Sequence, residues 1–212
     1  YDINVPSLII EGLDANEAWF NRNIEVSKIH IAEPDVHIRR SPRIQAENLA
    51  DLADKDLYSF IAGKLKGLAV NELEMEGGKV KLHFMENEDV APFQANDVAL
   101  WIQDFKLEPN QSNSGKPFNA ADIRLSLNAD KYAFTLPDNS HHVQIHALRV
   151  STSDSAIIID SLTLLPLQPP PGATSMIMVA PSVALYGLNA LSLIRDRRLE
   201  VDRVTLQNPK AT

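Results

Sequence analysis

Cysteine is absent from the 212-residue chain. This absence excludes disulfide bonds, thiolate catalysis and cysteine-ligated zinc or iron–sulfur centres. Long hydrophobic runs are also missing, since no window approaches the roughly 18 uninterrupted apolar residues of a membrane-spanning helix. Basic residues are in the minority, with 20 Lys and Arg against 28 Asp and Glu and a formal net charge of −8. This balance argues against nucleic acid as a partner, because phosphates favour a basic face.

The common sequence signatures of catalysis are missing as well. The chain has no G-x-S-x-G elbow, Walker A loop, G-x-G-x-x-G fingerprint or H-E-x-x-H motif. His141, His142 and His146 suggest a metal site, but on a strand His142 and His146 would lie about 13 Å apart, too far to share one ion. The sequence therefore predicts a protein that is not an enzyme and uses no cofactor and no metal.

The chain does contain an eight-residue pattern that recurs six times: apolar, any, apolar, two polar or small residues, apolar, any, apolar. Apolar residues two apart lie about 200° apart around an α-helix but on one face of a β-strand. The pattern therefore predicts a repetitive, mainly β protein. Its apolar positions are Ile24, Val26, Ile29 and Ile31; Leu68, Val70, Leu73 and Met75; Leu100, Ile102, Phe105 and Leu107; Val143, Ile145, Leu148 and Val150; Ile157, Ile159, Leu162 and Leu164; and Leu199, Val201, Val204 and Leu206.

The polar doublet inside each pattern has a geometric consequence. A strict period of two would place the second apolar pair on the opposite face of the strand. One extra residue, a β-bulge, restores the face and bends the strand. Bulges repeated at one level, as at Gln103-Asp104 and Asp160-Ser161, would curl an antiparallel sheet into a groove. The alternative is a β-sandwich whose strands are buried on both faces.

A long gapless repeat organises the two ends of the chain. Residues 6–34 align with residues 181–209 at a constant offset of 175, with nine of 29 positions identical, among them Gly12/Gly187 and Pro34/Pro209. From the sequence of each copy we expect a short strand, a Gly-Leu turn that leads into a short helix, and a long strand that ends at proline. Such a repeat is typical of arrays whose units bury their faces against neighbours.

The predicted organisation follows from these patterns. Residues 1–166 form a repetitive β segment that includes one amphipathic helix at about 45–64. Residues 167–175 form a Pro-rich linker, and residues 176–212 begin the next repeat unit. Further strands fit Val80–Phe84, Asp122–Leu127 and Tyr132–Leu136. We expect the chain to be a segment of a longer protein.

Several stretches resemble a known family. Ile24–Ile38 and Leu199–Pro209 resemble the repeated element of the AsmA-like proteins of Gram-negative envelopes, in which such a strand ends in proline and continues into another strand. Phe118–Leu127, Tyr132–Asp138 and Ser155–Pro166 are similar to large Bacteroidota-type members. The resemblance implies an antiparallel sheet curled into an apolar trough, in a periplasmic protein whose parent is anchored in the inner membrane. It also implies a part in envelope maintenance or phospholipid passage.

A Val, Leu or Ile side chain left in water forfeits roughly 1.5–3 kcal/mol, so a second sheet, a helix layer or acyl chains must cover the apolar positions. The predicted partners are a phospholipid or other acyl-chain lipid and neighbouring repeats of the same parent chain. The alternative is a tandem β-sandwich interaction or adhesion module that binds a protein or glycan; a hydrolase assembled from loops is weaker still. The predicted groove-lining residues are Ile24, Val26, Ile29, Ile31, Leu100, Ile102, Phe105, Leu107, Ile157, Ile159, Leu162, Leu164, Leu199, Val201, Val204 and Leu206.

Overall fold

The strands that the computed structural model describes form one twelve-stranded sheet. The structure describes residues 2–40, 58, 61–84, 93–109, 118–135, 140–167, 176–188, 198 and 200–211. The elements are β1 (Asp2–Asn4), β2 (Ser7–Glu11), the π-helical turn η1 (Glu17–Asn21), β3 (Asn23–Ala32), β4 (Asp35–Arg40), β5 (Gly67–Phe84), β6 (Phe93–Leu107), β7 (Asp122–Thr135), β8 (His141–Ser151), β9 (Ala156–Pro166), β10 (Met178–Tyr186), β11 (Arg203–Gln207) and β12 (Lys210–Ala211).

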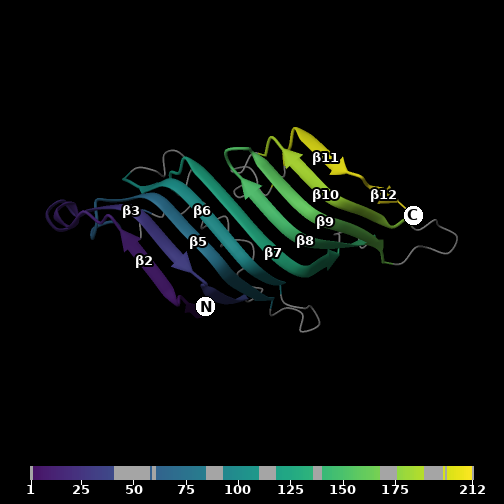
Figure 1. The fold of residues 1–212 in the computed structure, drawn as a ribbon, viewed down its shortest axis with the longest axis horizontal. Helices are drawn as coiled ribbons and strands as arrows, with labels where there is room; N and C mark the ends of the chain where they lie inside the picture. Colours follow the sequence, from purple (N-terminus) through teal and green to yellow (C-terminus); the bar gives the residue numbers. More distant parts are fainter. Residues whose placement is uncertain are drawn as a thin grey trace.

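The sheet is open and curled, and its strands follow one another across it in sequence order from β5 to β11 (Figure 1). The mainly β prediction is confirmed. The prediction of a wholly antiparallel sheet is wrong at two places, because β3 and β4 both pair with β5 in parallel. Parallel neighbours need a crossover connection of a dozen residues or more, and the chain between Arg40 and Gly67 is long enough to provide one.

A line of irregular pairings crosses the sheet and bends its strands. The register shifts around Gly78 in β5, after Asn96 in β6 and after Asn128 in β7. Non-glycine residues with positive φ mark the same line, including Asp97 at 50° and Ser161 at 56°. Bulges of this kind bend a strand and increase its twist, which accounts for the curl of the sheet.

A second irregular level lies at the doublet Gln103-Asp104, where Asp104 has a φ of 53°. Here the register of β5 and β6 stays constant on both sides of the doublet, because Asn71-Glu72 of β5 provides a matching extra residue. The predicted doublets therefore fall on two levels of the sheet rather than on one. Gln103-Asp104 belongs to this second level. Asp160-Ser161 belongs to the line of irregular pairings through Gly78, Asn96 and Asn128, which is called the bulge line below.

The repeat seen in the sequence is a repeat of strand pairing. The five pairs of β2 and β3 recur in β10 and β11 with every residue number raised by 175, so that Ser7–Ala32 corresponds to Ser182–Gln207 and Glu11–Lys28 to Tyr186–Arg203. The pairing of β1 with β4 recurs between β10 and β12, where Ile3–Val36 corresponds to Met178–Ala211. The strand pairing within residues 3–36 thus recurs in the described part of residues 178–211.

Other predicted features have mixed outcomes. The predicted helix at about 45–64 lies almost wholly outside the described residues, and the described positions Tyr58 and 61–66 form turns. The Gly-Leu turn of the first copy does lead into the short helical turn η1. The predicted strands Val80–Phe84 and Asp122–Leu127 are parts of the longer strands β5 and β7.

The described strands make a single layer, and its core is thin. Its buried apolar side chains are mostly Val and Ala, with Val70 the largest that is almost fully enclosed. A β-sandwich would need two packed sheets, whereas all strands of the described ranges belong to one. The sheet also continues past the predicted linker at 167–175, because β9 and β10 are antiparallel partners.

Candidate functional site

One face of the sheet carries an unbroken row of nine apolar side chains, one from each strand from β2 to β11 except β4. Each residue of this apolar row is the direct partner of the next, and directly paired residues share a face. The row consists of Leu8, Ile31, Met75, Leu100, Leu125, Val150, Ile157, Leu185 and Val204.

Two shorter rows lie beside it on the same face, because side chains two residues apart along a strand point the same way. One contains Ile10, Ile29, Leu73, Ile102 and Ile123. The other contains Leu127, Leu148, Ile159, Val183 and Leu206. The three rows together are called the apolar face below.

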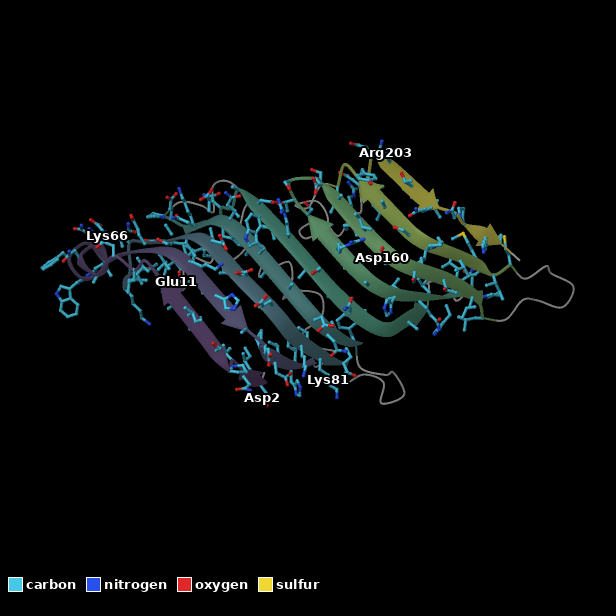
Figure 2. The ribbon with its side chains drawn as sticks, viewed as in Figure 1. Asp2, Glu11, Lys66, Lys81, Asp160 and Arg203 are labelled. Carbon is cyan, nitrogen blue, oxygen red and sulfur yellow. The ribbon has the colours of Figure 1, made fainter. Side chains whose placement is uncertain are left out.

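The apolar face has little protein over it. Among the described elements only η1 lies outside the sheet, and it contacts β3. Figure 2 accordingly shows side chains standing on a single layer of strands. Most members of the apolar row are half-buried by their neighbours in the sheet, whereas Leu8 and Val204 at the two ends are 56% and 50% exposed.

The structure brings together half of the residues predicted to line a groove. On the apolar face lie Ile29, Ile31, Leu100, Ile102, Ile157, Ile159, Val204 and Leu206. Ile24 and Leu107 both pair with Leu68, and Val26 and Phe105 both pair with Val70, at the far side of the second irregular level. Leu162 and Leu164 pair with β10 beyond the bulge line. Val201 precedes β11, and Leu199 lies outside the described residues.

The sequence analysis missed members of the apolar face that lack the full eight-residue pattern. Ile123, Leu125 and Leu127 alternate simply along β7, and this alternation is the signal that could have found them. Leu8 lies in a strand of five residues, which is too short to contain the pattern, and it is visible only through its pairing with Ile31. Leu185 lies in the nine-residue β10, where Met178, Ala180, Val183 and Leu185 have the spacing of the pattern with alanine at its second apolar position.

The opposite face carries charged and aromatic side chains together with a few apolar ones, such as Ile158, and it is hollowed. A cavity of about 850 Å³ lies against it, lined among others by Glu74, Trp101, Arg124, Arg149 and Tyr186. Four members of the apolar row also border this cavity, namely Met75, Leu100, Leu125 and Val150. Of the predicted groove residues, Leu100 alone belongs to this lining. Leu100 is the neighbour of Trp101 along β6, so its side chain points to the other face of the sheet.

The charged side chains in this lining have partners on the same face. Glu74 accepts from Lys28 Nζ at 2.7 Å and lies 3.3 Å from His30 Nδ1. Lys28, and then His30, lower the pKa of the Glu74 carboxyl, and the carboxylates of Glu72 and Glu74 raise the pKa of Lys28. This cluster ties β3 to β5.

The two arginines of the lining are paired in the same manner. Arg124 donates from Nε to Asp122 at 2.8 Å and lies over the Trp101 ring at 4.7 Å. Arg149 lies 3.1 Å from the Asp160 carboxylate. Both arginines are therefore already engaged as ion-pair partners on this face.

Asp122 is the buried charged side chain of the described residues, with 6% exposure at the start of β7. It accepts hydrogen bonds from Thr152 Oγ1 and Ser153 N, both at 3.0 Å, and from Ser153 Oγ at 3.1 Å. Burial would raise the pKa of its carboxyl, but these bonds together with Arg124 outweigh burial and lower it. Asp122 thus fixes the turn between β8 and β9 against β7.

In the described part of the chain, no three His, Asp or Glu side chains gather in a way that could hold a metal ion. No helix within the described ranges is long and apolar enough to cross a membrane. Comparison of the chain with protein-family models, with curated proteins and with solved structures gives no match.

Proposed function

We propose that the chain provides an apolar β-surface on which phospholipids or other acyl-chain lipids bind and move, as part of a periplasmic AsmA-like envelope protein. The observation that carries the proposal is the apolar row, which runs through nine paired strands without a polar residue. Movement of lipid along such a surface needs no chemical step, only a continuous apolar path.

The dimensions of the row suit acyl chains. Neighbouring strands lie about 4.8 Å apart, so nine strands carry the row across roughly 38 Å. The hydrocarbon part of one bilayer leaflet is about 15 Å thick, half of a typical core. A row of this length therefore exceeds one acyl chain, and lipids could occupy successive positions along it.

Contact between an acyl chain and the apolar face is also favourable in free energy. Covering a half-exposed Leu, Ile or Val recovers part of roughly 1.5–3 kcal/mol per side chain. An acyl chain in turn gains about 0.8 kcal/mol for each CH₂ group that it removes from water. The charged groups of the opposite face would remain in contact with water while the lipid lies on the apolar face.

The test is lipid content after purification from membranes, measured by native mass spectrometry and lipid extraction. Leu125 and Ser126 are neighbours in β7 and both border the cavity, but their side chains point to opposite faces of the sheet, that of Leu125 to the apolar face and that of Ser126 to the other. We expect bound lipid in the unmodified protein and in Ser126→Glu, and its loss in Leu125→Glu, because a charge among acyl chains is costly.

Other outcomes of the same experiment would contradict the proposal. Equal lipid content in all three proteins, or no lipid in any of them, would rule out lipid binding at the apolar face. Loss of lipid in Ser126→Glu alone would place the lipid in the cavity of the polar face. Circular dichroism spectra of the variants check that each remains folded.

A further inference from the structure

We propose that the outer edge of β11 and β12 receives one more strand, which runs parallel to them and carries a Gly-Gly pair, in the manner of β5. This proposal concerns an interaction surface and is independent of lipid binding. It follows from the equivalence of the two repeat units, in which β3 corresponds to β11 and β4 to β12 at an offset of 175 residues.

In the first unit, β3 and β4 share one neighbour. β5 pairs in parallel with both, for example Ile31 with Met75 and Val36 with Val80. Where β3 passes into β4, the chain makes two more hydrogen bonds to β5. Glu33 N donates to Glu76 O at 2.8 Å, and Pro34 O accepts from Lys79 N at 2.7 Å.

The Gly-Gly pair of β5 fits this junction. A Cβ atom added to Gly77 would lie 3.3 Å from Glu33 Cγ, and one added to Gly78 would lie 3.1 Å from Val98 O and 3.4 Å from Pro34 Cγ. Gly77 also has a φ of +65°, which side chains rarely allow. The junction therefore selects glycine at the position of Gly77, whereas the tight contact of an added Cβ at Gly78 would be with Val98 of β6.

The second unit has the same junction without the neighbouring strand. Asn208 has a φ of 42°, close to the 50° of the equivalent Glu33, and Pro209 stands in the place of Pro34. Pro34 is buried, whereas Pro209 is exposed. Within the described residues, no strand pairs with β11 or β12 on this side. Figure 2 shows Arg203, the first residue of β11, at the outer edge of the sheet.

Side-chain exposure follows the same equivalence. Ile29 and Ile31 are half-buried beside β5, whereas the equivalent Val204 and Leu206 are 50% and 41% exposed. An edge with free main-chain groups and exposed apolar side chains is a site for strand addition. Val204 and Leu206 are thus exposed at the edge where a strand equivalent to β5 would cover them.

The opposite edge of the sheet provides an independent check of this reasoning. Leu8 in β2 is 56% exposed, whereas the equivalent Val183 in β10 is 6% exposed because β9 pairs beside it. An exposed position at either edge is therefore covered in the other copy by a neighbouring strand. The β1–β2 edge corresponds to the side of β10 where β9 pairs antiparallel, so a strand added there would not meet a junction like that between β3 and β4.

The experiment extends the full chain after Thr212 with a second copy of residues 38–84, which is the segment that follows residue 37 in the first unit. Leu206 of the chain corresponds to Ile31, the partner of Met75. Because the chain has no cysteine, Leu206→Cys combined with Met75→Cys in the appended copy tests one register only. We expect an intramolecular disulfide, and at least tenfold slower amide exchange over residues 203–211.

Two controls make the result specific. Leu73→Cys in the appended copy, two residues out of register, should give little disulfide with Leu206→Cys. Gly77→Val with Gly78→Val in the appended copy should abolish the slower exchange, while the original chain stays unchanged. Fast exchange at residues 203–211 in the extended chain would overturn the proposal, as would equal protection with the valine pair. A disulfide-linked dimer would also overturn it, because the edge would then take a second copy.

Discussion

Asp122 shows at the scale of one residue how a polar side chain holds three strands of a thin sheet. Its carboxylate receives bonds from the β8–β9 turn and from Arg124. Asp122→Ala leaves buried donors without an acceptor, which typically costs about 1–3 kcal/mol. We expect a loss of this size in urea unfolding. Asp154→Asn, an exposed position in the same turn, should change stability by less than about 0.5 kcal/mol.

The titration of Asp122 gives a pH dependence with a defined sign. The pKa of its carboxyl is lowered below the ordinary value of 3.8, so the folded state binds the proton more weakly than the unfolded state. Its contribution to stability is therefore present above pH 3.8 and is lost as the pH falls through the folded-state pKa. In acid unfolding curves, Asp122→Asn should flatten this part of the profile. An unchanged profile would mean that other carboxylates control it.

At the scale of the element, Gly12 after β2 and Gly187 after β10 occupy equivalent positions in the same kind of turn. Gly12 and Gly187 have φ of +67° and +73°, and an added Cβ would collide with Ser27 or with Asp202, which are themselves equivalent in the repeat. Gly12→Ala and Gly187→Ala should each destabilise the protein by more than about 1 kcal/mol. Gly63 has a φ of +83°, and a Cβ atom added to it would have no heavy atom within 4 Å. Gly63→Ala therefore measures the free-energy cost of a positive φ for alanine without a steric clash. Equal losses in all three would exclude a steric contribution.

The sequence predicts those elements whose pattern lies within one strand, and it does not predict pairings between strands that are distant in the chain. The eight-residue pattern correctly locates β3, β5, β6, β8 and β9, because alternation of apolar residues is a property of the strand itself. Parallel pairing of β3 with β5 is not local, since it depends on how the chain between Arg40 and Gly67 returns. The continuity of the apolar row is not local either. It requires a register that places Leu125 opposite both Leu100 and Val150.

At the scale of the whole molecule, the sheet has one apolar and one polar face, with a bend along the bulge line. A closed sandwich would bury the apolar face against a second sheet, and the described strands leave it half-covered. The polar face instead gathers ion pairs between neighbouring strands, such as Lys28 with Glu72. Exposed pairs of this kind add little stability, typically below about 1 kcal/mol. We therefore expect the stability of the protein to depend strongly on the surroundings of the apolar face.

This dependence leads to a prediction about lipid removal. A ligand that binds only the folded state raises its stability by RT ln(1 + [L]/Kd), or about 2.7 kcal/mol at 100 times Kd. We expect the delipidated protein to melt at a lower temperature and to bind a hydrophobic dye, and short-chain phospholipid below its micelle concentration to reverse both effects. Ser126→Glu should respond in the same way, whereas Leu125→Glu should not respond. A melting temperature that is independent of lipid in the unmodified protein would show that the apolar face is satisfied without lipid, and that its row of side chains serves packing alone.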